Sequence, residues 1–167
     1  ANGVGAPLSF GSQSLRISNA VTSGSFGDQT FSKSLTNEAG ESTAQNGGLS
    51  GGTRLNHFEA QWDFTSAAPA SEQVGLVTVA SPDRGDGARM SWVQMADTPT
   101  GLAVNFYDYQ TGPLHTCDGD FVMTNVASGL SRSAVHTIKI TMQFVEGPSN
   151  DIVEVFVDGD LLHTGTS

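Results

Sequence analysis

The sequence predicts an all-β protein, built as a two-sheet antiparallel β-sandwich. Short segments in which apolar and polar residues alternate recur along most of the chain, as they do over His136–Gly165. Such alternation is typical of strands with one buried face. Turn-forming residues separate these segments at regular intervals, and no apolar periodicity of helical type continues beyond a single turn. Many short strands with regular turns are typical of two stacked antiparallel sheets.

The composition supports one domain of this class. The chain has 167 residues, which is enough for a single domain with its own core. Its hydrophobic content of 37% is low, and its 20 glycines favour polar turns between short strands. We expect residues 1–7 to form a flexible tail or linker and residues 8–167 to form the domain.

Each strand is predicted by its own alternation. Within 55–65, Phe58, Ala60, Trp62 and Phe64 occupy alternate positions and face inward. The other strand candidates share this property or are short apolar runs bounded by turns. They cover 8–17, 73–80, 88–96, 102–109, 120–125, 137–144, 153–157 and a return strand from Leu161. Residues 127–133 are interpreted as holding one helical turn.

The last hairpin is the most specific local prediction. Asp158 and Gly159 separate an apolar alternating run from Leu161 and Leu162. An Asp-Gly pair between two such runs predicts a type I′ turn, in which both central residues have positive φ.

The charge excludes some partners. Seventeen acidic residues against seven basic ones give a formal net charge of −10. Because such a surface repels phosphate, we expect no nucleic-acid partner, and no apolar run is long enough for membrane insertion. Cys117 is the single cysteine, so the chain has no internal disulfide, and we interpret it as a loop residue without a catalytic role.

The order of motifs resembles a known superfamily. HFEAQWDF, GLVTVASPDRGDGARMSW and GLAVNFYD are followed by HTIKITMQF and the VEVFVDG hairpin. Together they resemble the concanavalin A-like lectin/glucanase superfamily, close to the laminin G-like domains of bacterial secreted and surface proteins. The resemblance covers about Leu8 to Ser167. It implies a jelly roll whose concave sheet binds glycans, commonly with calcium, and a secreted or cell-surface location. In such domains a further strand usually follows the hairpin, so we expect this domain to lack its last strand.

Candidate sugar-binding residues lie on one strand face. Sugars need flat aromatic rings beside fixed hydrogen-bonding groups, because they present both C–H patches and hydroxyls. Asn105, Tyr107 and Tyr109 offer these groups at alternate positions. Trp62 and Trp92 share parity with apolar neighbours, so both are interpreted as core residues.

A catalytic pair is the alternative. Glu59 and Asp63 share a strand face four residues apart, with Gln61 between them where the glucanases of this fold carry an aspartate. Two strand steps separate their Cα atoms by about 13 Å, which suits an inverting rather than a retaining arrangement. We interpret the pair as a solvated polar face and assign no catalytic residue. A glycoside hydrolase, a polysaccharide lyase or a structural spacer remain alternatives to a glycan-binding or adhesion module that contacts neighbouring domains.

Calcium is the candidate cofactor, because calcium is coordinated by several oxygen atoms and a short loop can supply them. Three loop pairs offer such oxygens, and each is interpreted first as turn-forming. They are Asp83 and Asp86, Asp118 and Asp120, and Asn150 and Asp151.

Overall fold

A computed structural model describes residues 56–72, 76–80, 91–109, 121–145 and 150–166. Within these ranges the regular elements are all strands. They are β1 (His57–Phe64), β2 (Leu76–Ala80), β3 (Ser91–Thr98), β4 (Gly101–Tyr109), β5 (Phe121–Leu130), β6 (His136–Gln143), β7 (Ile152–Val157) and β8 (Asp160–Thr166). No helix of membrane-spanning length and hydropathy occurs in this part of the chain. The tail 1–7 and the strand 8–17 lie outside the described residues.

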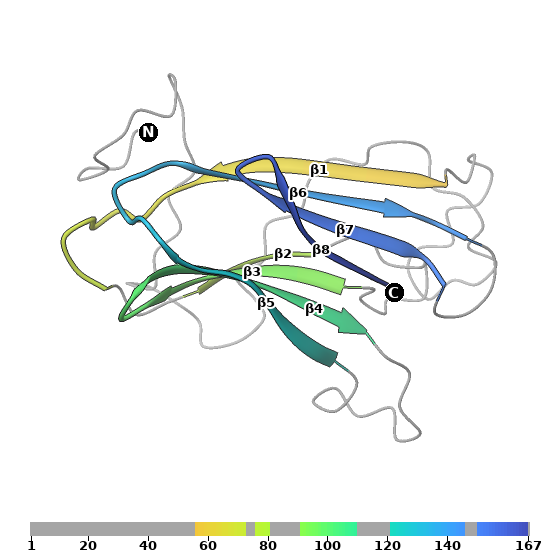
Figure 1. Ribbon diagram of the computed structural model, residues 1–167, viewed down its shortest axis with the longest axis horizontal. Coiled ribbons are helices and arrows are strands. Elements are labelled where there is room, and N and C mark those ends of the chain that lie inside the picture. The colour runs from red at the N-terminus through yellow and green to blue at the C-terminus, as the bar shows by residue number, and fades with distance from the viewer. Residues whose placement is uncertain (1–55, 73–75, 81–90, 110–120, 146–149, 167) are drawn as a thin grey trace, which may run out of the picture.

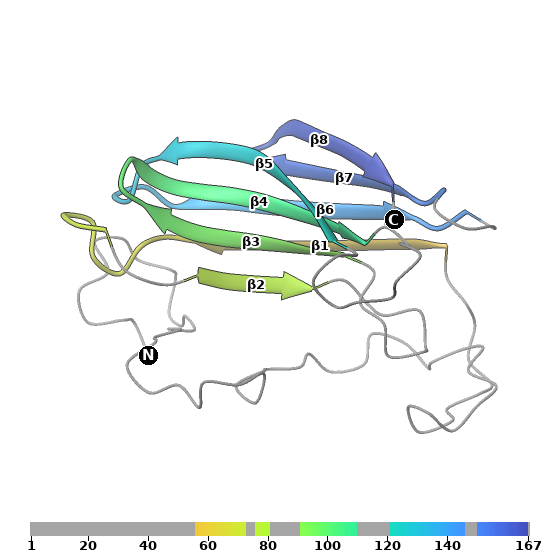
Figure 2. The same cartoon turned by 90° about the horizontal axis from the view of Figure 1, so that it is seen from below.

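The strands form two four-stranded sheets. One has the order β1-β6-β7-β8 and is called the β6 sheet; the other has the order β2-β3-β4-β5 and is called the β4 sheet. Every pairing is antiparallel. The sheets lie as two layers, one above the other (Figure 1), and β5 contacts β8 at one edge (Figure 2). The predicted all-β, two-sheet antiparallel architecture is confirmed.

The core fills the space between the two layers. Both sheets contribute side chains from alternate positions, as the predicted alternation requires. Val104 and Phe106 of β4 are fully buried, while Phe58 and Trp62 of β1 are partly buried against the core. The buried apolar residues of this cluster are Val93, Met95, Val104, Phe106, Ile138, Ile140, Met142, Val153, Val155 and Val157.

The β7–β8 hairpin has the predicted turn. Asp158 has a φ of 53° and Gly159 a φ of 93°, so both central residues have positive φ. This is the geometry of a type I′ turn, which matches the twist of the flanking strands. Asp158 also caps the neighbouring strand, because its Oδ1 accepts a 2.9 Å hydrogen bond from the Thr137 amide.

Two predictions are wrong. Trp92 is not a core residue: Val93 and Met95, its neighbours of opposite parity, are buried in the core, so Trp92 lies on the outer face of the β4 sheet. The interpretation depended on Met90, a residue outside the described ranges. The helical turn expected within 127–133 is wrong for 127–130, where β5 continues to Leu130; a turn follows, in which the Ala134 amide donates to the Ser131 carbonyl at 3.3 Å. Trp62 packs against the core as predicted.

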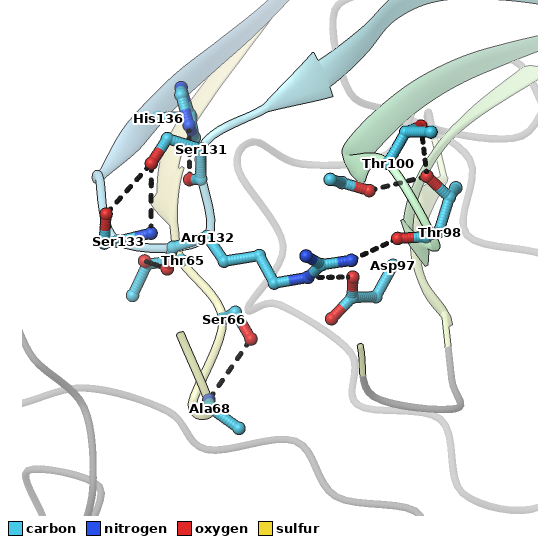
Figure 3. Close-up of polar contacts among 11 residues, drawn as sticks. Thr65, Ser66, Ala68, Asp97, Thr98, Thr100, Ser131, Arg132, Ser133 and His136 are labelled. Atoms are coloured by element: carbon cyan, nitrogen blue, oxygen red, sulfur yellow. Dashed lines mark hydrogen bonds and ion pairs between the residues drawn. The ribbon is translucent and has the colours of Figure 1, made fainter. Parts of the chain in front are cut away.

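A group of polar contacts ties the two layers together where the chain crosses from β5 to β6 (Figure 3). We call Arg132, Asp97, Thr98 and Thr65 the clasp. The Arg132 Nε donates to Asp97 Oδ1 at 2.7 Å, and Nη2 donates to the Thr98 carbonyl. From the other layer, Thr65 Oγ1 donates to the Ala134 carbonyl at 2.6 Å. The Arg132 and Asp97 side chains are only 16% and 8% exposed, so this ion pair is largely shielded from solvent.

Candidate functional site

The outer face of the β4 sheet carries amide and aromatic side chains. Val93, Val104 and Phe106 point into the core, so residues one position away from them point outward. The outward residues of β3, β4 and β5 with described side chains include Trp92, Gln94, Asn105, Tyr107, Phe121, Met123 and Asn125. None of these carries a charge. The face therefore offers neutral hydrogen-bonding groups beside aromatic rings.

Strand register brings these residues into two adjacent rows. One row runs Gln94, Asn105, Asn125 across three strands. The other runs Trp92, Tyr107, Met123 across the same strands. Neighbouring strands are about 4.8 Å apart, so each row spans roughly 10 Å. Tyr109 shares the outward parity of Tyr107 and pairs with Phe121 in the register, but its side chain is outside the described part.

The first row is a hydrogen-bonded chain, which we call the amide ladder. Asn125 Nδ2 donates to Asn105 Oδ1 at 2.9 Å, and Asn105 Nδ2 donates to Gln94 Oε1 at 3.1 Å. Both bonds point the same way along the row, so each polarises the next. The ladder fixes the orientation of all three amide groups before any ligand arrives.

The second row begins an aromatic cluster of Trp92, Tyr107 and Phe121. The Trp92 and Tyr107 rings are stacked, with centroids 4.9 Å apart and planes at 17°. Phe121 approaches Trp92 to 4.1 Å in a tilted arrangement, which closes the cluster from β5. Such contacts contribute about 0.5–1.5 kcal/mol per pair and hold the rings in place.

Exposure rises toward β5. Asn105, at the centre of the ladder, is only 9% exposed. Tyr107 is half-buried, whereas Asn125 is exposed and Met123 is 53% exposed. The predicted residues Asn105 and Tyr107 are therefore brought together, but Asn105 acts as a bridge inside the ladder. The accessible part of the site lies at Tyr107, Met123 and Asn125.

Glu59 and Asp63 lie elsewhere. They occupy the outer face of β1 in the β6 sheet, the layer opposite the amide ladder. Both are exposed, and Asp63 Oδ1 accepts a 2.6 Å hydrogen bond from Thr137 Oγ1. The two carboxylates therefore do not converge with Asn105 and Tyr107 on one surface.

Two histidines interact with carboxylates away from the ladder. The His136 Nδ1 lies 2.7 Å from Asp158 Oδ2, and its Nε2 lies 3.0 Å from the Ser131 carbonyl. Burial works against ionisation of Asp158, but the His136 contact and the Thr137 amide outweigh it and lower the pKa of this carboxyl. The pair secures the start of β6 to the hairpin turn.

His163 points between the two sheets. It pairs with Val155, a fully buried residue, and its ring lies 4.9 Å from that of Phe106 across the interface. Burial lowers the pKa of His163, while the negative charge of Asp108 acts in the opposite direction. A side chain at Gly165 would meet the His163 ring at 2.7 Å, so this glycine makes room for the imidazole.

Among the described residues, no three His, Cys, Asp or Glu side chains cluster. Asp151 caps a turn, because its Oδ1 accepts a 2.7 Å bond from the Val145 amide. The acidic pairs at 83 and 86 and at 118 and 120, like Cys117, lie outside the described residues.

Gln94, Phe121, Met123 and Asn125 were not among the residues that the sequence singled out for the site. Their outward parity could be read from β3 and β5 separately. What the sequence lacks is the pairing of these strands with β4, which aligns Gln94 and Asn125 on either side of Asn105.

Comparisons with protein-family models, with curated proteins and with solved structures find no match to this chain.

Proposed function

We propose that this domain is a non-catalytic carbohydrate-binding or adhesion module that holds its ligand on the outer face of the β4 sheet. The observation that supports this most is the amide ladder beside the aromatic cluster. Hydroxyl-rich ligands need hydrogen-bonding groups held in fixed positions, and their C–H faces pack on aromatic rings. Both kinds of group occur here in adjacent rows on one surface.

The resemblance to the concanavalin A-like superfamily adds a finer fold assignment. We propose a jelly roll in which the β4 sheet is the concave, ligand-binding layer, within a larger secreted or cell-surface bacterial protein. Neighbouring domains of that protein are further candidate partners. The two-sheet antiparallel architecture is compatible with this assignment.

The proposal gives Glu59 and Asp63 no catalytic role. They are exposed, and two strand steps keep their Cα atoms about 13 Å apart. They also lie on the other layer from the amide ladder. A hydrolase built on this pair would act on a surface that lacks the ladder and the aromatic cluster.

The test is retention on a polysaccharide panel. Tyr107→Ala removes the ring that lies between Trp92 and Met123, and we expect at least about tenfold weaker binding. Phe156→Ala is the matched control, because it removes a half-buried ring from the outer face of the β6 sheet. Absence of binding to any glycan would favour a structural spacer. Equal losses in both variants would show that the ligand does not select the β4 sheet.

We propose calcium as a cofactor because of the family resemblance alone. An ion bound only by the folded protein raises the melting temperature. We therefore expect a higher melting temperature in calcium than in chelator if an acidic loop outside the described residues binds the ion. Identical melting temperatures in calcium and in chelator would contradict the proposed calcium binding.

A further inference from the structure

We propose that Asn125 is the specificity-determining residue of the β4 face, and that it selects a neutral saccharide by accepting a hydrogen bond from a ligand hydroxyl. This inference rests on the proposed function and names the class of ligand. It follows from the hydrogen bonds of one amide group, from its exposure and from the charges around it.

The amide nitrogen of Asn125 is fully used inside the protein. It donates to Asn105 Oδ1 at 2.9 Å and to the Ala127 carbonyl at 3.2 Å. A primary amide nitrogen has two hydrogens, so these two bonds occupy both. Only the Oδ1 atom of Asn125 is left to meet a ligand, and it is a pure acceptor.

The ladder prevents the Asn125 amide from turning over. A flipped amide would set its oxygen against Asn105 Oδ1 and the Ala127 carbonyl, which are both acceptors. Turning over Asn105 and Gln94 as well would restore the bonds along the ladder but not the bond to the Ala127 carbonyl, which can only accept, so this carbonyl sets the direction of the ladder. The orientation of Oδ1 is therefore set before binding, which lowers the entropy cost of recognition.

Asn125 is also the accessible end of the ladder. Its residue is exposed, whereas Asn105 is 9% exposed. Beside it on the same face is Met123, which is 53% exposed and pairs with Tyr107 in the register. A sugar ring lying on Tyr107 and Met123 would bring its hydroxyls to the Asn125 oxygen.

Charge decides between neutral and anionic sugars. Two of the seven Lys and Arg side chains lie in the described ranges, and both are held elsewhere. Arg132 binds Asp97 in the clasp, and the Lys139 ammonium lies 4.3 Å from the centre of the Phe156 ring in the β6 sheet. A carboxylate or sulfate would therefore meet an acceptor oxygen at Asn125, on a protein of net charge −10. A hydroxyl can donate instead, so neutral saccharides are favoured.

The experiment uses the full chain and two groups of probes at physiological salt. Dextran, mannan and a mixed-linkage β-glucan are neutral; alginate, polygalacturonate and heparin are anionic. Asn125→Ala removes the acceptor, and Asn56→Ala is the matched control, since Asn56 is also exposed but precedes β1 in the β6 sheet. We expect binding to a neutral probe, weakened about tenfold by Asn125→Ala and unchanged by Asn56→Ala.

A ligand-side measurement covers the case in which Asn125→Ala does not fold. O-methylated oligosaccharides from the bound polysaccharide lack hydroxyl donors, and we expect wild-type protein to bind them about tenfold more weakly. Tighter binding to anionic probes, lost in Tyr107→Ala, would overturn this inference while the proposed function stands. Binding to a neutral polysaccharide that is unchanged both by Asn125→Ala and by O-methylation would also overturn this inference and leave the proposed function standing. No binding to any probe would overturn both.

Discussion

The outer faces of the two sheets are built from the same alternation but differ in chemistry. On the β4 sheet, Gln94, Asn105 and Asn125 bond to one another across three strands, beside stacked rings. On the β6 sheet, the outward residues include carboxylates, a lysine and several threonines. Among them are Glu59, Asp63, Thr137, Lys139, Thr141 and Glu154.

This difference teaches that strand alternation identifies which residues face outward, but cross-strand bonds identify which outward residues form a site. On the β6 sheet two bonds join a threonine to a carboxylate, one of them between Thr141 Oγ1 and Glu154 Oε2 at 3.1 Å. These are isolated pairs on a charged surface. On the β4 sheet the bonds join into one chain, which holds three amides in a fixed orientation.

The largest expected effect concerns the clasp, on which both faces depend. Arg132→Met removes the guanidinium that binds the Asp97 carboxylate, which is 8% exposed, and should cost about 3 kcal/mol of unfolding free energy. Urea denaturation measures this loss of unfolding free energy. Lys139→Met is the matched control, since it removes a cation from the β6 face and should cost under about 1 kcal/mol. Equal costs would mean that the clasp does not hold the layers together.

The next effect separates the two faces. Asn105→Leu leaves Gln94 Oε1 without its donor and removes the acceptor of Asn125 Nδ2. Because Asn105 is buried, we expect a loss of about 1–2 kcal/mol in chemical denaturation. Thr141→Val breaks the corresponding pair on the β6 sheet and should cost less, since the half-buried Glu154 can turn to water. A larger cost for Thr141→Val would contradict the contrast.

A smaller effect probes the interface between the layers. Burial lowers the pKa of His163, with Asp108 opposing, so the folded protein binds a proton less readily there than the unfolded chain. Stability should therefore be full above about pH 6.5 and fall as the pH drops below it. No other titratable side chain of β4, β5 or β7 that is described faces this ring; Glu154 points outward.

The check is the unfolding free energy at pH 7 and pH 5. His163→Phe should reduce the difference between them. Asp158, whose pKa is lowered, adds stability that is lost only below about pH 4, as it becomes protonated. An unchanged pH dependence in His163→Phe would show that this ring is not buried as described.

The smallest effect is expected for Glu59→Gln and Asp63→Asn. Both residues are exposed on the β6 sheet, so each change should alter stability by less than about 0.5 kcal/mol and leave glycan binding intact. Thermal unfolding and the polysaccharide panel measure this. Hydrolysis of a polysaccharide by the wild-type protein, abolished by Glu59→Gln, would instead support the catalytic alternative.

Much of the fold could be predicted from the sequence because alternation reports burial directly. Phe58 and Phe64 of β1, Val104 and Phe106 of β4, and the Asp158–Gly159 turn all follow local rules. The outward position of Trp92 could not be predicted in this way, because a single apolar neighbour two residues away is a weak guide to the face of the sheet that a side chain occupies. Val93 and Met95 of the opposite parity are the buried residues.

The candidate site was only half predictable. Asn105 and Tyr107 were found because they share a strand, where spacing is local. Gln94 and Asn125 join them only through the pairings of β3 and β5 with β4. Register depends on long-range packing, and a shift by one residue would turn Asn125 to the other face. The buried role of Asn105 likewise depends on neighbours that its own strand does not reveal.

The most direct test of the central claim is an amide chemical-shift titration of the full chain with an oligosaccharide from a bound neutral polysaccharide. We predict that the largest changes in amide chemical shift fall on the β4 sheet, at Gln94, Asn105, Tyr107, Met123 and Asn125. Shifts concentrated on the β6 sheet, at Glu59, Asp63, Lys139 and Glu154, would contradict it.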